Sequence, residues 1–144
     1  MKNARILIAT ALLLAAVSVY VQAQERQLLT ATVPFAFTVE NSNLPAGAYT
    51  VSTLPPYNMV KVQSADGRKV AMISAIPSHS SGESQQAKLV FHRFGNQYFL
   101  AQVWELGSNV HRDLRGGNLA RELAKRGERS QSTTILASAG KGSH

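Results

Sequence analysis

Apolar and polar residues alternate with a period of two along much of this chain, which is the pattern expected of β-strands. The stretch 32–39 is the first clear case, and it contains Pro34, which has no N–H to offer a neighbouring strand. We therefore expect this strand at the edge of a sheet or at a bulge. A second strand is expected over 48–54, after the turn-rich stretch 41–47.

Two turn signals predict β-hairpins further along the chain. Asp66-Gly67 is a strong two-residue turn signal, and Gly95-Asn96 separates two apolar stretches in the same way. Both faces of the second hairpin carry apolar residues, so we expect it in the centre of a sheet. The four flanking strands are expected at 59–63, 70–76, 88–93 and 98–104.

The pattern changes after Gly107. Asn118 is a suitable cap for a short helix at about 118–127, which Gly127 would end. The stretch 132–138 then predicts a last strand that returns to the sheet.

Together these elements predict an all-β fold. We expect an antiparallel β-sandwich, or a small barrel, of about six to eight strands with one short C-terminal helix. This single domain is expected to occupy residues 24–140, followed by a disordered tail at 141–144.

The N-terminal segment has a different composition. Lys2 and Arg5 are followed by the almost wholly apolar stretch 6–21, and Val21-Gln22-Ala23 has suitable residues for cleavage before Gln24. This is the pattern of a secretory signal peptide, and the apolar stretch is shorter than the roughly 20 residues of a membrane-spanning helix. We favour a cleaved signal peptide over an anchor.

Residues 1–23 are therefore expected to form a signal-peptide helix that is removed on export. We expect a periplasmic or extracellular protein with no transmembrane span after cleavage. The chain contains no cysteine, which excludes thiol catalysis, disulfide redox chemistry and cysteine-ligated zinc.

Positive charge is concentrated near the C-terminus. Residues 24–110 hold six basic and five acidic residues, whereas 111–144 hold seven basic and three acidic residues. Such a segment attracts polyanions such as nucleic acid, anionic lipid or acidic polysaccharide, and the alternative is a solvated basic tail. The candidate polyanion-binding residues are Arg112, Arg115, Arg121, Lys125, Arg126 and Arg129.

One catalytic motif occurs without its context. His111-Arg112-Asp113-Leu114, followed by Asn118, matches the catalytic loop of protein kinases. The sequence has no glycine-rich phosphate loop, no lysine in a Val-Ala-Ile-Lys setting and no Asp-Phe-Gly. We interpret this segment as a polar link into the helix.

Other catalytic chemistry has little support in the sequence. The four histidines lie on separate predicted elements without a metal-binding spacing, so we expect no metal and no cofactor. Carboxylates at turns and strand ends, Glu105 among them, are expected to be solvated. The remaining enzymatic hypothesis is a small secreted hydrolase that uses His79 or His92 with a nearby carboxylate.

A possible ligand-binding face lies on the second predicted hairpin. Four residues suited to holding a sugar or a peptide share one face if the turn has two residues: Arg93, Tyr98, Gln102 and Trp104. Three apolar residues share that face as well: Leu89, Phe91 and Leu100. The alternative is therefore that this face belongs to the core.

Several segments resemble a group of small exported β-rich proteins of soil bacteria, of acidobacterial type. The segments are Val33-Pro34-Phe35-Ala36-Phe37, Leu44-Pro45-Ala46-Gly47-Ala48-Tyr49-Thr50-Val51, Ser64-Ala65-Asp66-Gly67, Ala87 to Gly95, Tyr98-Phe99-Leu100, Trp104 and Arg121-Glu122-Leu123-Ala124. The resemblance covers nearly all of the chain after the signal peptide. It implies export and a β-rich fold, and it carries no catalytic or binding residues.

The sequence thus favours an exported, non-enzymatic β-sandwich module that binds a partner or has a structural role at the cell envelope. An envelope glycan or a surface protein is the expected partner, with a polyanion on the basic segment as a further hypothesis. The alternative is the small hydrolase described above.

Overall fold

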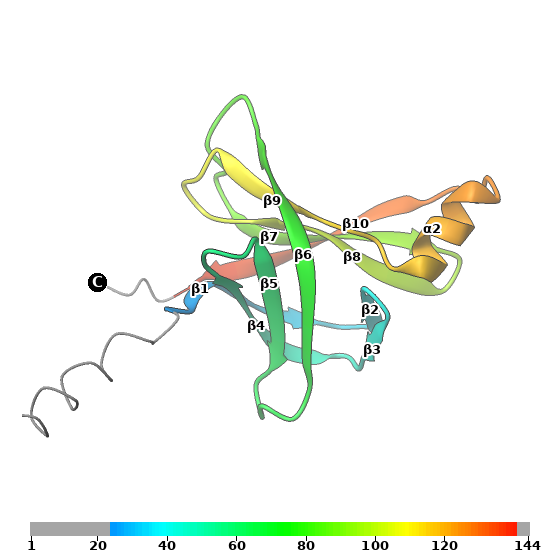
Figure 1. Ribbon diagram of the computed structural model, residues 1–144, viewed down its shortest axis with the longest axis horizontal. Coiled ribbons are helices and arrows are strands. Elements are labelled where there is room, and N and C mark those ends of the chain that lie inside the picture. The colour runs from blue at the N-terminus through cyan, green and yellow to red at the C-terminus, as the bar shows by residue number, and fades with distance from the viewer. Residues whose placement is uncertain (1–23, 141–144) are drawn as a thin grey trace, which may run out of the picture.

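The computed structural model describes residues 24–140, which form ten strands and one helix (Figure 1). The strands are β1 (Arg26–Val33), β2 (Phe37–Val39), β3 (Ser42–Leu44), β4 (Gly47–Leu54), β5 (Met59–Ser64), β6 (Val70–His79), β7 (Ala87–Phe94), β8 (Gln97–Trp104), β9 (Val110–Leu114) and β10 (Gln131–Ala139). The helix α2 (Asn118–Lys125) lies between β9 and β10 in the chain. The predicted signal peptide and the predicted tail lie outside the described residues.

Eight of these strands close into an antiparallel barrel. The order around the ring is β1, β4, β5, β6, β9, β8, β7 and β10, and β10 pairs again with β1. The short β2–β3 hairpin lies outside the ring and joins β8 through one parallel pairing, Thr38 with Phe99. The all-β class and the short helix are confirmed, and the architecture is the barrel rather than the sandwich.

Closure of the barrel depends on a strand that the sequence did not predict. Val110–Leu114 pairs with β6 on one side and with β8 on the other. The interpretation of this segment as a polar link was wrong, because its polar residues alternate between the two faces of the barrel wall. Arg112 pairs with the core residue Val103 and faces inward, whereas its neighbours His111 and Asp113 face outward.

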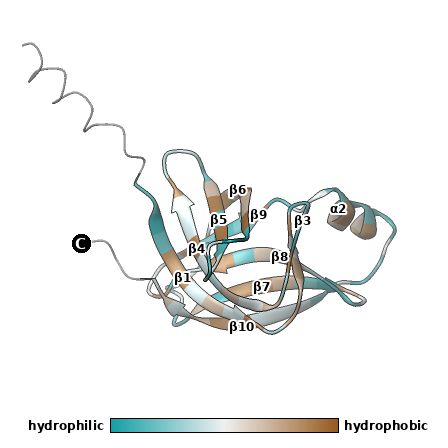
Figure 2. Ribbon diagram, turned by 90° about the horizontal axis from the view of Figure 1, so that it is seen from below, coloured by the Kyte–Doolittle hydropathy of each residue, from teal (hydrophilic) through white to brown (hydrophobic). Residues whose placement is uncertain are grey.

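The barrel interior is packed with apolar side chains, which is normal for a barrel of eight strands. Inward-facing residues of every strand of the ring contribute to one buried cluster, and brown apolar stretches recur along these strands in Figure 2. Phe91 lies in this cluster with no exposed surface, with its ring 5.0 Å from Phe35 and 5.4 Å from Phe37. The Asp66-Gly67 hairpin places Val62 opposite Ala71, which is the register that a two-residue turn at the predicted position gives.

The helix α2 lies outside the barrel, next to β3 in Figure 2. Leu123 and Ala120 pack against Phe94 and Phe99, which form a second and smaller apolar cluster. Within residues 24–140, no helix combines the length and the hydropathy needed to cross a membrane.

The start of α2 differs from the prediction. The N-cap residue is Gly117, and Asn118 is the first helical residue. The Asn118 backbone N–H donates a hydrogen bond of 3.2 Å to Oδ1 of Asn41, which belongs to the turn between β2 and β3. The helix is therefore capped from a distant part of the chain.

We expect Asn41→Ala to lower the free energy of unfolding by about 1 kcal/mol, because a helix N-terminal N–H loses its acceptor. Asn41→Asp keeps the acceptor oxygen and adds a negative charge near the helix N-terminus, so it is expected to keep or raise the stability. Urea denaturation of both variants measures the difference. An equal loss in both would contradict a capping role.

Candidate functional site

The structure divides the predicted ligand-binding face into two pairs. Phe91 lies opposite Leu100, but the preceding residue Val90 lies opposite Gln102, so Ala101 is an extra residue in β8. This β-bulge reverses the alternation that the sequence analysis had assumed to be continuous. As a result Arg93 and Tyr98 lie on the side of the barrel interior, whereas Gln102 and Trp104 lie on the outer face.

The first pair takes part in packing. The Tyr98 ring stacks on Phe35 with a centroid distance of 3.8 Å, and the Arg93 guanidinium lies 5.5 Å from the Tyr98 ring. Arg93 Nε also donates a 2.6 Å hydrogen bond to the Gly95 carbonyl. These contacts favour the structural alternative for both residues.

In the second pair, neighbouring side chains cover the Trp104 ring. His111 stacks on it at 4.0 Å, and the Lys88 Nζ lies 4.7 Å from its centroid. These two residues come from β9 and β7, the strands on either side of β8, so they cover opposite faces of the indole. A sugar ring would have to displace one of them before it could stack on Trp104.

Polar side chains continue from Trp104 across the outer face. Trp104 Nε1 donates to Gln102, whose Nε2 donates to Asp113 Oδ1 at 2.8 Å. The other Asp113 oxygen accepts a hydrogen bond from the Ser78 hydroxyl and lies 3.6 Å from His111 Nε2. Ser78 thus donates directly to the carboxylate, which is not the serine–histidine–carboxylate order of a catalytic triad.

The two histidines of the hydrolase hypothesis are placed differently from His111. Both His79 and His92 are exposed, on β6 and β7. Among residues 24–140, neither lies within ion-pair distance of a carboxylate. The described residues also include no group of three or more potential metal ligands placed to hold an ion.

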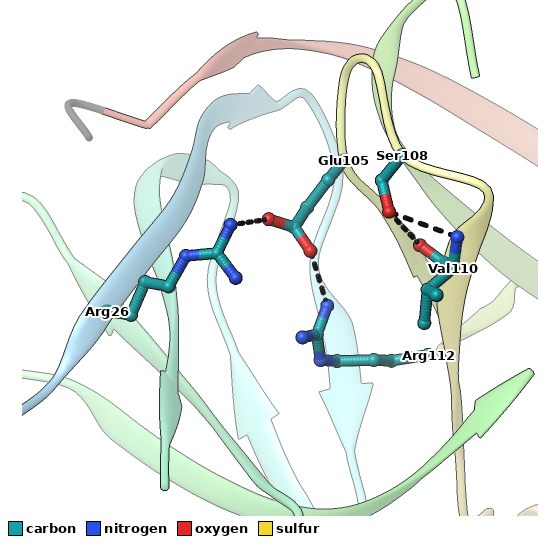
Figure 3. Close-up of polar contacts among 5 residues, drawn as sticks. All are labelled: Arg26, Glu105, Ser108, Val110 and Arg112. Carbon is teal, nitrogen blue, oxygen red and sulfur yellow. Dashed lines mark hydrogen bonds and ion pairs between the residues drawn. The ribbon is translucent and has the colours of Figure 1, made fainter. Parts of the chain in front are cut away.

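A partly buried ion-pair network lies at one mouth of the barrel, where β1 and β9 begin and β8 ends (Figure 3). Glu105 directly follows β8 and is 8% exposed. One of its oxygens accepts from Arg26 Nη2 at 2.8 Å, and the other accepts from Arg112 Nη1 at 2.7 Å. The expectation that Glu105 is solvated was wrong.

The two arginines of this network differ in their environment. The Arg112 side chain is 17% exposed, whereas the Arg26 side chain is 59% exposed. Burial of a carboxylate is costly unless the charge is paired, and Arg112 supplies the buried partner. The network contains two positive groups and one negative group, so it has an excess of one positive charge.

A small cavity opens beside Arg112. Its volume is about 130 Å³, and its other walls come from the end of β4, the following turn, the first residue of β5, and β6. Most of the wall is apolar and includes Pro55, Pro56, Met59 and Pro77. We call this space, with Arg112 in its wall, the mouth pocket.

The hairpin that carries Glu105 and Arg112 is held by local hydrogen bonds. Ser108 Oγ accepts from the Val110 N–H at 3.0 Å and donates to the Val110 carbonyl at 3.2 Å (Figure 3).

A separate ion pair joins β5 to the residue that precedes β1. Lys61 of β5 donates a 2.7 Å hydrogen bond to Glu25, and this bond lowers the pKa of the Glu25 carboxyl.

The predicted polyanion-binding residues do not form one equivalent set. Arg112 is partly buried and paired with Glu105, so it does not belong to an exposed basic surface. The other five are exposed on α2 or beside it: Arg115, Arg121, Lys125, Arg126 and Arg129. Glu122 and Glu128 lie among them in the sequence, which lowers the local excess of positive charge.

Fold and site together define a small closed β-barrel with a partly buried guanidinium at one mouth. Comparisons with protein-family models, curated proteins and solved structures found no match for this chain. The residues of the mouth pocket and their contacts therefore carry the functional argument.

Proposed function

We propose that this protein is an exported, non-catalytic binding module whose mouth pocket holds a small carboxylate. Export is supported by the signal-peptide pattern of the sequence. The observation that carries the binding proposal is that Arg112 lines an otherwise mostly apolar cavity.

The chemistry of Arg112 supports an anionic ligand. A guanidinium has five N–H donors, and within residues 24–140 the Arg112 side chain uses one nitrogen, Nη1, in its contact with Glu105. The excess positive charge of the network favours an anion over a neutral group. A carboxylate is planar and accepts two parallel hydrogen bonds from a guanidinium, so it is the best geometric match.

The walls of the pocket support a short apolar body on this ligand. Pro55, Pro56 and Pro77 offer rigid apolar surface in the same cavity wall as Arg112. The cavity of about 130 Å³ has the volume of about four water molecules, at roughly 30 Å³ for each water in the liquid, which limits the ligand to a short acid. Acids of the size of propionate or butyrate fit this description.

A non-catalytic role is supported by the arrangement of the polar groups. Asp113 accepts directly from Ser78, and Glu105 is held between two arginines. Neither carboxylate is hydrogen-bonded to a histidine that in turn contacts a nucleophile in the described part of the chain.

The test is a titration of the mature chain, beginning at Gln24, with acetate, propionate, butyrate and inorganic phosphate, followed by NMR. We expect propionate or butyrate to bind with a dissociation constant of about 1 mM, because the few non-hydrogen atoms of such a ligand limit its binding free energy. Arg112→Gln is expected to weaken binding at least about tenfold, because the charged hydrogen bonds to the carboxylate are lost.

Arg26→Gln is the matched control. It also removes one ion pair from Glu105, but Arg26 does not line the cavity, so binding should change by less than about threefold. Equal weakening in both variants, or no saturable binding of any acid, would contradict the proposal.

A further inference from the structure

The barrel has a seam at which two neighbouring strands separate. β1 and β10 pair only at Leu29 with Ala139 and at Thr30 with Ser138. Beyond Thr30, β1 pairs with β4 alone, and β10 pairs with β7 alone from Gln131 to Ala137. Figure 1 shows these two strands diverging from the end at which they meet.

The separation leaves an opening in the barrel wall. A cavity of about 390 Å³ is lined there by the inward-facing Ala31 and Tyr49 and by the outward-facing Thr32 and Leu136. Ile135 faces the interior but is only partly buried. Residues of both orientations therefore border the same opening.

The strand β10 consequently has a free edge. From Gln131 to Ala137, the structure shows no hydrogen bond from this edge to another described residue besides those of the β7 ladder. Exposed edges of this kind are normally protected by charged residues, proline or a bulge. The segment 131–139 contains no charged residue and no proline, and its pairing with β7 has no register shift.

We propose that the free edge of β10 pairs with the same edge of a second copy of this chain. Antiparallel pairing across a two-fold axis would satisfy the unpaired backbone groups of both copies at once. Because the edge has no charge, the second copy would bring no charge into the contact. The outward side chains Thr134 and Leu136 are exposed and would extend the contact.

The absence of cysteine from the sequence allows a direct test. Single cysteines are introduced into the mature chain at the outward positions of β10: Ser132→Cys, Thr134→Cys and Leu136→Cys. When the two-fold axis passes at an outward position of β10, as we propose, that position lies opposite itself, within the roughly 4.4–6.8 Å between Cα atoms that a disulfide needs. We expect oxidation to give a covalent dimer whose yield is several-fold higher at one of the three positions.

Met72→Cys is the matched control, because Met72 is 48% exposed on β6, another strand of the barrel. In a cysteine-free background, Thr134→Lys should weaken the dimer at least about tenfold in sedimentation, because two lysines approach across the axis. Its circular dichroism should stay unchanged, because Thr134 is exposed. Equal yields at β10 and at Met72, with a monomer at all concentrations, would overturn the proposal.

Discussion

Glu105→Gln is expected to lower the free energy of unfolding by about 2–4 kcal/mol, measured by denaturant unfolding. The substitution keeps the size of the side chain but removes the negative charge between Arg26 and Arg112. Arg112 then keeps a positive charge that is largely buried and has lost its ionic partner. The two guanidinium groups also repel each other without the carboxylate between them.

The two contacts of Glu105 should contribute unequally. Arg26→Ala is expected to cost less than about 1 kcal/mol, because its side chain is 59% exposed and its pairing is weakened by solvent. The double variant Glu105→Leu with Arg112→Met removes both buried charges and is expected to regain most of the stability lost in Glu105→Gln. A double variant as unstable as Glu105→Gln would show that buried charge is not the cause.

The parts of the fold that depend on residues close together in the chain could be predicted from the sequence. Alternation identified most of the barrel strands, and the turns at Asp66-Gly67 and Gly95-Asn96 were placed correctly. The expected single strand at 32–39 was wrong: β1 ends at Val33 and β2 begins at Phe37, with Pro34 between the two strands. In these hairpins the turn fixes the register, so the information lies within a few residues. The short helix was also found, because Asn118 and Gly127, which lie close to its two ends, are local signals.

The features that depend on distant residues could not be predicted. Arg26 and Glu105 are 79 residues apart in the chain, and nothing near Glu105 indicates that an arginine will cover it. The strand β9 could not be recognised from the sequence, because its central residue Arg112 faces the barrel interior. Arg112 can face inward because Glu105 is there as a buried acceptor. The bulge at Ala101 divided the predicted ligand-binding face, because one extra residue reverses the facing of all later side chains.

Gly117→Ala is expected to lower the free energy of unfolding by about 1–3 kcal/mol, an effect close to that of Glu105→Gln. Gly117 has φ −66° and ψ 176°, which any residue adopts, so backbone strain is not the cause. A Cβ at this position would lie 1.8 Å from the Glu40 carbonyl oxygen and 2.7 Å from Asn41 Oδ1. The obstacle is mainly backbone, so the helix or the β2–β3 turn has to move.

Gly116→Ala is the control for this prediction, because its Cβ would lie 3.5 Å from the Ala120 side chain, an ordinary contact. It should leave the stability unchanged or raise it by about 0.4–1 kcal/mol, since the unfolded chain loses conformational freedom.

Hydrogen exchange shows which elements Gly117→Ala destabilises. If only α2 and the β2–β3 turn lose protection, the contact joins two peripheral elements. Uniform loss across the barrel would mean that their docking supports the pairing of β2 with β8. Equal stability of the two alanine variants would contradict a close approach at Gly117.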